Sequence, residues 1–312
     1  MELNKRRIAV LLAAYNGDKY IKDQIESILL QKECEVHIFI SVDVSEDSTV
    51  KIISHYEALH FNITQLPYGN KYGSAGANFF RLLLDVDYSD YDYIAFADQD
   101  DIWLPEKLER AINMLESNGC DGYSSNVTAF WPDGREKLIK KDYPQKKYDY
   151  LFESPGPGCT FLMTNKLAMH LSKYLHRNKE GVSKLWLHDW LCYAYARSNN
   201  FSWYIDTRSL MLYRQHENNE VGANSGFGSL LRRIKSITKG DAKNKVIVQA
   251  EFLEINSAPI RMFRDKKYFS LVPLLFDCRR STKDCFLFLV VMIFLHISMT
   301  VGLIKRYLGR IS

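Results

Sequence analysis

Short apolar runs alternate with segments of helical periodicity through the first half of the chain, and this alternation restricts the fold more than any other feature. Between the runs, apolar side chains recur three and four residues apart, as on one face of a helix. Strands that alternate with helices in this way build a largely parallel sheet with helices on both faces. The predicted fold class is therefore α/β. The runs expected as strands cover residues 7–14, 36–42, 61–65 and 93–97.

The second half of the sequence is less regular and mixes strand-like runs with polar loops. Such loops carry function when the scaffold beneath them is rigid. A helix is expected to begin near His188. The other expected elements are strands over residues 122–131, 159–164 and 201–213, and loops over residues 154–158 and 214–226.

Four polar residues, Asp98-Gln99-Asp100-Asp101, follow the apolar run at residues 93–97. Carboxylates a few ångströms apart raise each other's pKa, so a divalent cation is expected among them. If the extended geometry continues past the strand, Asp98 and Asp100 face one side and Gln99 the other. Such oxygen ligands suit Mg²⁺ or Mn²⁺, which keep open positions for phosphate oxygens. The alternative is a solvated acidic turn in which Asp101 caps the next helix.

Polar residues also follow the first two runs, Tyr15 and Asn16 after one and Asp43 after the other. Ligands of open α/β sheets gather beyond the carboxyl ends of parallel strands. Together with Asp98, these residues predict one ligand crevice at that edge of the sheet. Next in the chain, Asp47-Ser48-Thr49 is placed to cap a helix.

Positive charge is concentrated in the C-terminal part of the chain. Residues 1–227 contain 25 Lys and Arg against 31 Asp and Glu, and residues 228–312 contain 16 against 6, so their net charges are −6 and +10. A basic region suits nucleic acid or an anionic membrane surface. The apolar run at residues 285–304, about 30 Å long as a helix, favours the membrane over nucleic acid. It fits a spanning helix, an interfacial or re-entrant helix, or a buried helix.

The six cysteines are scattered without a C-x-x-C pair, so neither a zinc site nor a disulfide framework is expected. Reduced thiols of this kind indicate a cytosolic environment. The first residues lack the long apolar core of a secretory signal, so export is not expected.

Several motifs, taken in their order along the chain, resemble inverting family 2 glycosyltransferases of the GT-A fold. Each motif is weak alone, whereas the ordered set over residues 7–222 is specific. Within that family, the set most resembles bacterial rhamnosyltransferases that build O-antigen or capsule chains. The motifs are AYNG at residues 14–17, SVDVSEDST at 41–49, NKYGSAGAN at 70–78, DQDDIW at 98–103, HDW at 188–190, and YRQH at 213–216 with Asn219 and Gly222.

The resemblance implies metal-dependent transfer, with Mg²⁺ or Mn²⁺, from a dTDP- or UDP-linked sugar to a lipid-linked saccharide. Asp189 would be the general base, because the family places a carboxylate at this helix start. Asp100 and His216 would bind the metal. Trp186 and Trp190 would stack on a sugar ring. The residues expected to bind the nucleotide sugar are Ala14, Tyr15, Asn16, Asp43, Asn70, Gly73, Asn78, Asp98, Gln99 and Arg214.

Some of these residues have a more specific expected role. Asp43 would accept from the imide N–H of uracil or thymine, and Asp98 would hold the ribose or a ligand of the metal. Arg214 would neutralise the diphosphate, and residues 218–226 would close over the donor. Alternatives remain open: Asp43 and Gly73 in turns, Asn78 and Asp189 as helix caps, His216 exposed to solvent, and Trp186 and Trp190 in the core.

The chain departs from the family at two positions. Val42 stands where the family usually has the first of two aspartates, and Val44 where glycine is common, so the contacts to the ribose and the geometry of the turn are expected to differ. Two other functions stay open. One is a hexosyl or N-acetylhexosaminyl transferase of the same fold that uses a UDP-sugar, and the other is a noncatalytic membrane-bound assembly factor that kept the nucleotide-sugar pocket.

We expect three regions. Residues 1–227 would form the catalytic domain, residues 228–283 a basic helical region, and residues 284–312 a membrane-associating or transmembrane helix with a basic tail. The expected location is the cytoplasmic face of the bacterial inner membrane, with a peripheral or single-pass attachment.

Overall fold

The computed structural model describes residues 5–216 and 241–308. They belong to two compact units, one made of Met1–Asp142 with Ser154–Ala223 and the other of Tyr143–Glu153 with Asn224–Ser312. A short internal segment, Tyr143–Glu153, therefore packs with the C-terminal part of the chain. No sequence signal indicated this, and the domain boundaries expected after residues 227 and 283 stay predictions.

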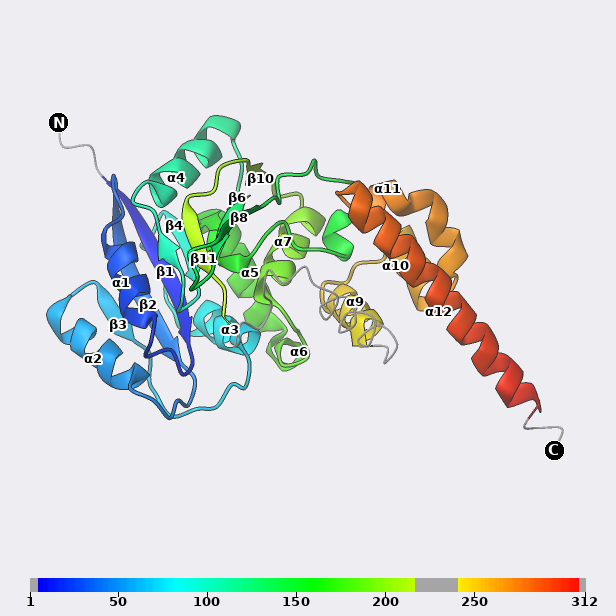
Figure 1. Cartoon of the computed structure of the whole chain (residues 1–312), viewed down its shortest axis with the longest axis horizontal. Coiled ribbons are helices and arrows are strands. Elements are labelled where there is room, and N and C mark those ends of the chain that lie inside the picture. Colours follow the sequence, from blue (N-terminus) through cyan, green and yellow to red (C-terminus); the bar gives the residue numbers. More distant parts are fainter. Residues whose placement is uncertain (1–4, 217–240, 309–312) are drawn as a thin grey trace. The chain divides into compact units, whose positions relative to one another are not determined.

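The first unit is built on a seven-stranded sheet with strand order β10-β6-β9-β4-β1-β2-β3. The central strands β4, β1 and β2 are parallel and lie side by side (Figure 1). Only β9 runs antiparallel to its neighbours in this sheet, so the predicted α/β fold with a largely parallel sheet is confirmed. The strands are β1 (Arg6–Ala14), β2 (Cys34–Val42), β3 (Ile63–Gln65), β4 (Tyr93–Ala97), β6 (Gly122–Ser125), β9 (Leu162–Thr164) and β10 (Trp203–Asp206).

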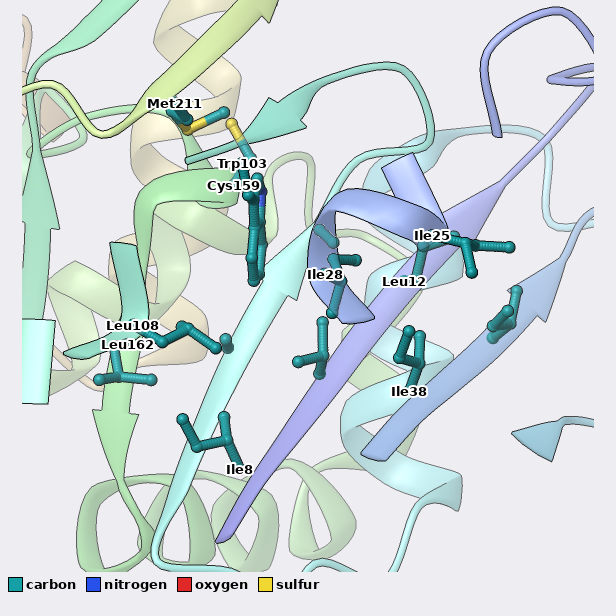
Figure 2. Close-up of a cluster of buried hydrophobic side chains, with 14 of the residues drawn as sticks. Ile8, Leu12, Ile25, Ile28, Ile38, Trp103, Leu108, Cys159, Leu162 and Met211 are labelled. Atoms are coloured by element: carbon teal, nitrogen blue, oxygen red, sulfur yellow. The ribbon is translucent and has the colours of Figure 1, made fainter. Parts of the chain in front are cut away.

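Helices pack on both faces of this sheet. On one face, Ile8 and Leu12 of β1 form a core with Ile25 and Ile28 of α1 and Leu108 of α4 (Figure 2). Because side chains alternate along a strand, the other side chains of β1 face the layer in which α3 contacts α5 and α7. The helices are α1 (Ile21–Leu29), α2 (Thr49–Leu59), α3 (Ala75–Asp85), α4 (Lys107–Asn118), α5 (Asn165–Arg177), α6 (Lys179–Val182) and α7 (His188–Ser198).

A second, four-stranded sheet places two distant motifs side by side. Its strand order is β5-β11-β7-β8, with β5 (Ile102–Trp103), β7 (Val127–Phe130), β8 (Glu136–Ile139) and β11 (Met211–Arg214). β11 pairs antiparallel with β5, so that Leu212 lies opposite Ile102. The YRQH motif is thereby held next to the DQDD turn, although about 110 residues separate them in sequence.

Two of the predictions of a single strand are wrong, because each of these segments forms two strands that belong to different sheets. Residues 122–131 form β6 and β7, and residues 201–213 form β10 and most of β11. The chain changes sheet at Asn126, whose Nδ2 donates to the carbonyl oxygen of Thr207 at 2.7 Å and whose Oδ1 accepts from the N–H of Lys141 at 2.5 Å. A strand-like pattern does not encode this corner, because the residues on both sides of it are buried.

Two further expected strands are shorter than the sequence suggested. The run at residues 61–65 yields only β3, which begins at Ile63. The run at residues 159–164 starts inside a 3₁₀ turn, Gly158–Thr160, and only its end forms β9. In both cases the apolar residues before the strand are stabilised by turn hydrogen bonds, such as that from the N–H of Phe161 to the carbonyl of Gly158 at 2.8 Å.

The described part of the second unit is helical. Its apolar run lies, as expected, in one long helix, and Thr282–Thr300 of that helix is long and apolar enough to cross a membrane by length and composition. The elements are η1 (Asp149–Leu151), α9 (Asp241–Phe252), α10 (Ala258–Arg264), η3 (Tyr268–Leu274), α11 (Leu275–Cys278) and α12 (Thr282–Leu308).

The internal segment of the second unit is held by a buried ion pair. Arg280 has a side chain 3% exposed, and its Nε lies 3.6 Å from an oxygen of Asp149 and 3.6 Å from one of Glu153. The backbone N–H of Arg280 also donates to Glu153 at 2.7 Å, and Nη1 of Arg279 donates to the carbonyl of Phe152 at 2.9 Å. These contacts join residues 143–153 to the C-terminal helices.

Candidate active site

Three strands of the large sheet end at the same edge. Ala14 of β1 lies opposite Val42 of β2, and Leu12 of β1 lies opposite Ala97 of β4. The residues that follow these strands, Tyr15, Asp43 and Asp98, therefore leave the sheet together, as the sequence predicted.

The side chain of Gln99 joins the loops that follow β1 and β4. Its Oε1 accepts from the N–H of Tyr15 at 2.7 Å, and its Nε2 donates to the carbonyl of Tyr15 at 2.8 Å. Gly17 leaves room for this amide, because a Cβ there would lie 2.3 Å from Oε1. Gln99 is thus occupied with the backbone of the loop, and its role in nucleotide binding stays a prediction.

The loop after β1 is also tied to the loop after β2. Asn16, in the left-handed conformation with φ 43°, accepts from the N–H of Glu46 at 2.9 Å through its side-chain oxygen. Ser48 is the N-cap of α2, but its side chain makes no capping hydrogen bond; Asp47, the residue before it, accepts instead from the N–H of Thr49 at 3.0 Å through Oδ1. The hydroxyl of Thr49 in turn accepts from the N–H of Gly17 at 2.7 Å.

Asp43 holds the loop that precedes α3. Its carboxylate accepts from the N–H groups of Tyr72 at 2.8 Å and Gly73 at 2.7 Å, and from that of Val44 at 2.8 Å. Gly73 has φ +81°, a conformation that glycine adopts without strain. Asn70, in the same loop, is exposed. The base-reading role of Asp43 stays a prediction, since a carboxylate has acceptor positions beyond these three.

Asn78 does not cap α3, so the capping alternative is wrong. Ser74 is the N-cap, and its hydroxyl accepts from the N–H of Ala77 at 3.2 Å. Asn78, 2% exposed, instead donates to the carbonyls of Ser41 at 2.9 Å and Ala14 at 3.3 Å. Through these two hydrogen bonds it joins the carboxyl ends of β1 and β2.

Asn78 belongs to a short hydrogen-bonded chain with Ser41 and Arg81 that the sequence reasoning did not identify. The hydroxyl of Ser41 donates to the side-chain oxygen of Asn78, and Arg81, one helical turn further on, donates to that hydroxyl at 3.0 Å. Arg81 also donates to the carbonyl of Pro67 at 2.7 Å. An Asn and an Arg three residues apart on one helix face were the available signal.

The DQDD turn and the YRQH motif form one polar cluster. The chain bends at Gln99 and Asp100, so the expected alternation of side chains does not continue past Asp98. Oδ2 of Asp100 lies 2.6 Å from Nε2 of His216, which brings the two predicted metal ligands together. The ring of His216 stacks on Tyr20, the residue before α1, at a centroid distance of 5.3 Å.

Asp101, which the sequence left without a clear role, is fully buried in this cluster. Its Oδ1 accepts from the backbone N–H of Arg214 at 3.1 Å. Burial, followed by the charges of Asp100 and Asp98, raises the pKa of Asp101 well above its usual value. Ligand atoms of Asp98, Asp101 and Cys159 lie within 4.8 Å of one another. No sequence motif pointed to Cys159.

The donor set of this cluster fits a hard divalent cation. Three carboxylates crowd one turn and an imidazole lies against one of them, which is the mixture of oxygen and nitrogen ligands that Mn²⁺ accepts and Mg²⁺ partly shares. Burial contributes most to the raised pKa of Asp101, and the negative charges of Asp100 and Asp98 add to it; a cation would offset the part due to charge. The described residues thus include an acidic group able to hold a cation at the carboxyl end of β4.

The guanidinium of Arg214 is directed toward α1. Its Nε donates to the carbonyl of Asp100 at 2.7 Å, and its Nη2 donates to Asp23 at 3.1 Å. Its central carbon lies 4.4 Å from the centroid of the Tyr20 ring. Arg214 therefore fixes the DQDD turn, and its contact with the diphosphate stays a prediction. The lid expected over residues 218–226, with Asn219 and Gly222, lies outside the described residues.

Asp189 is the second residue of α7, and its carboxylate accepts from the N–H of Trp190 at 2.5 Å. Burial raises the pKa of Asp189 to about 6, against the effects of hydrogen bonds from Trp190 and Ser154 and of the positive charge of Lys141. An aspartate whose pKa lies closer to neutrality is a better proton acceptor than an exposed one. It also remains mostly ionised at pH 7.

The neighbours of Asp189 differ in exposure. His188 is buried, and its ring stacks on Phe79 at a centroid distance of 3.8 Å. Burial lowers the pKa of His188 to about 3, so this side chain is neutral and acts in packing. Trp190 is 7% exposed and Trp186 is 38% exposed, which makes Trp186 the better placed of the two to stack on a sugar.

Comparison with known proteins decides the family. The model of glycosyl transferase family 2 matches residues 9–174. The chain belongs to glycosyl transferase family 2. This family 2 glycosyltransferase is 46% identical over 224 residues to the dTDP-rhamnosyl transferase RfbG of Shigella flexneri, an overlap of 72% of this chain and 78% of that protein. The expectations of family, fold and enzymatic class are confirmed.

More distant proteins agree on the family and the fold. The glycosyltransferase is 27% identical over 199 residues to the UDP-Glc:alpha-D-GlcNAc-diphosphoundecaprenol beta-1,3-glucosyltransferase WfgD of Escherichia coli, 62% of this chain and 72% of that protein. The crystal structure of S. aureus TarS 1–349 superposes with a TM-score of 0.55 at 15% identity, covering 85% of this chain and 72% of that one. The structural likeness extends to the fold alone.

Gly76 sets how closely α3 approaches the segment that precedes α7. It lies in the first turn of α3, and a Cβ built there would be 2.1 Å from the carbonyl oxygen of Trp186. That oxygen belongs to the segment that leads into α7 and Asp189. At this glycine the close approach is that of the protein's own backbone.

We expect Gly76→Ala to destabilise the protein by about 1–3 kcal/mol, because the methyl group forces residues 185–187 away from α3. Helix propensity alone would make the Ala variant more stable by about 1 kcal/mol. The sign of the change in unfolding free energy therefore shows whether the clash or the propensity is the larger effect. Urea unfolding measures it, with Ser54→Ala on the exposed side of α2 as a control for propensity alone. A stabilised Gly76→Ala protein would contradict the packing described above.

Proposed function

We propose that this glycosyltransferase moves rhamnose from dTDP-rhamnose to a lipid-linked saccharide, with inversion at the anomeric carbon, at the cytoplasmic face of a bacterial membrane. The observation that carries the donor assignment is the 46% identity to a dTDP-rhamnosyl transferase over 72% of the chain. The long apolar helix supports the membrane location. The relative WfgD, named for a diphosphoundecaprenol acceptor, supports the lipid-linked acceptor.

The proposed reaction is an in-line displacement. The acceptor hydroxyl oxygen attacks the anomeric carbon of the donor while its proton passes to a carboxylate oxygen of Asp189. The bond from that carbon to the diphosphate oxygen breaks, and the nucleoside diphosphate departs with the electron pair. The position of Asp189 in the first turn of α7, three residues after the exposed Trp186 in sequence, supports its role as the base.

The remaining residues would hold the donor. Tyr15 and Asn16, in the loop after β1, would contact the donor. Asp43 would accept a hydrogen bond from the imide N–H of the base. Asp100 and His216 would hold Mg²⁺ or Mn²⁺, with Asp98 and Asp101 close by, and the bound cation would neutralise charge on the diphosphate. Arg214 would keep Asp100 and Asp101 in place for this purpose.

A second candidate is transfer of glucose or an N-acetylhexosamine from a UDP-sugar, which the identity of 27% to WfgD supports. Asp43 does not separate the two, because uracil and thymine carry the same imide donor. A noncatalytic protein would keep the nucleotide-sugar pocket but would not need a general base. The pKa of Asp189, raised to about 6, suits a general base and therefore favours the catalytic role.

The first prediction concerns the donor. We expect purified protein, given Mn²⁺ and a membrane extract with lipid-linked saccharides, to use dTDP-rhamnose with a kcat/KM at least about 10²-fold above that for UDP-glucose or UDP-N-acetylglucosamine. Mass spectrometry of the lipid-linked product identifies the added sugar. A mass increase of a hexose with UDP-glucose as the better donor would replace the proposal by the second candidate, and donor binding without any transfer would leave the noncatalytic role.

The second prediction concerns the base. The pKa of Asp189 is raised to about 6, so the carboxylate is lost as pH falls through that value and kcat/KM falls about tenfold per pH unit below it. We expect Asp189→Asn to lower kcat by about 10²–10⁴ with little change in the Kd of dTDP, measured by calorimetry. Asp133→Asn, in the exposed turn between β7 and β8, is the matched control. A normal rate in Asp189→Asn would refute the assignment.

The third prediction concerns the cation. We expect Asp100→Ala and His216→Ala to weaken Mn²⁺ binding, measured by calorimetric titration in the presence of dTDP, by about tenfold or more. Asp133→Ala again serves as the control, since it removes an exposed carboxylate. Because imidazole suits Mn²⁺ better than Mg²⁺, His216→Ala should narrow the preference for Mn²⁺. Unchanged Mn²⁺ affinity in both variants would place the cation elsewhere.

A further inference from the structure

Helix α12 carries two apolar faces, and only one of them is covered. Cys285, Phe288 and Met292 are 5%, 8% and 1% exposed and belong to the core of the second unit. They are three and four residues apart, so they form one helix face, which packs against η3 and α11.

The opposite face consists of large apolar side chains exposed to solvent. We call it the outer stripe: Phe286 at 69% exposed, Val290 at 45%, Ile293 at 38%, Phe294 at 40% and Ile297 at 54%. At about 100° per residue these five positions fall within an arc of about 100°, opposite the covered face. Only 17% of the apolar window Thr282–Thr300 is buried. A helix that is apolar all round needs an apolar environment on each side.

Two exposed aromatic side chains lie on the neighbouring elements of the second unit. Phe276 of α11 is 67% exposed and Phe269 of η3 is 51% exposed, and the ring of Phe269 lies 4.3 Å from that of His296 on α12. Together with the outer stripe they make an unusual amount of exposed aromatic and aliphatic surface for one small helical unit. Isolated exposed apolar residues are ordinary, whereas a continuous row marks a contact surface.

The packing of the first part of α12 argues against a helix that crosses the bilayer, whose hydrocarbon layer is about 30 Å thick. The first half of α12 cannot be surrounded by lipid, because Phe288 and Met292 are packed against protein. The remainder, residues 293–308, is about 24 Å long and contains Lys305 and Arg306.

Charge favours an anionic lipid surface over an apolar protein partner. Lys283 is exposed and lies three residues before Phe286, on the same face of α12. Lys266 and Lys267, both exposed, precede η3, and residues 228–312 have a net charge of +10. Amphipathic surfaces that pair a row of large apolar residues with lysines lie in the headgroup region of one leaflet.

We propose that the outer stripe inserts into one leaflet of an anionic bilayer, with α12 lying in the plane of the membrane and not crossing it. Lys283, on the same face of α12 as the stripe, meets lipid phosphates at the edge of the inserted surface. The proposal deepens the membrane location of the proposed function, but it does not depend on which sugar is transferred. A second copy of this chain is the competing occupant of the stripe.

Vesicle flotation tests the occupant. Full-length protein should float with vesicles of phosphatidylethanolamine and phosphatidylglycerol and much less with phosphatidylcholine alone. The double variant Phe286→Glu with Ile293→Glu should lose at least tenfold in the fraction bound. Phe61→Glu, at a position 97% exposed in the first unit, is the matched control and should float normally. Sedimentation equilibrium without lipid should give the same mass for wild type and double variant.

Two results would overturn the proposal. One is normal flotation of the double variant, and the other is a dimer that the double variant converts to monomer. Far-ultraviolet circular dichroism checks that the variants fold, and Val290→Ser, a milder change in the same stripe, should show a partial loss of binding. Transfer activity is measured separately, so failure to float and failure to use dTDP-rhamnose remain distinguishable.

Protease protection tests the orientation. A peptide tag added after Ser312 should stay inaccessible to protease in intact spheroplasts and become accessible in inverted membrane vesicles, on the side of the catalytic unit. Cleavage of the tag in spheroplasts would mean that α12 crosses the membrane and would reject the in-plane arrangement.

Discussion

The alignment of β1, β2 and β4 at their carboxyl ends is the constraint on which the site depends. The amide of Asn78 joins the last carbonyl of β1 to Ser41 of β2, and Gln99 joins the loop after β1 to the turn after β4. A shift of one residue between these strands would turn every side chain to the opposite face. The polar residues after the strands are therefore positioned by hydrogen bonds to the backbone, before any ligand contributes.

The sequence predicted those features that depend on local pattern. Residues 8–14 of β1 and the whole of β4 are apolar because both faces of the sheet are covered there, and the residues after β1, β2 and β4 had to meet at one edge. It could not predict that Asn126 redirects the chain into a second sheet, or that Asp101 is enclosed by Cys159 and Arg214. Those environments are formed by residues that are distant in sequence, and no sequence pattern indicates that these residues are in contact. The role of Asn78 was missed for the same reason.

A buried lysine is coupled electrostatically to the DQDD turn. Lys107 is buried, its Nζ lies 3.5 Å from the centroid of the Trp103 ring, and burial lowers its pKa to about 7. The groups of Cys159 and Asp101 act in the opposite direction on the same pKa. The protonation of Lys107 therefore depends on the acidic groups at the carboxyl end of β4, in a part of the core where water does not screen the interaction.

Residues 143–153 belong to the C-terminal unit, and this limits how segments of related genes can be exchanged. Arg280 meets Asp149 and Glu153 across a long separation in sequence, and removing one partner of a buried ion pair costs about 3–5 kcal/mol. An exchange of everything after residue 227 between two related genes would place a foreign C-terminal unit against these carboxylates. The C-terminal helices and the internal segment are encoded by two separate stretches of the gene. A functional exchange between related genes therefore has to replace both stretches together.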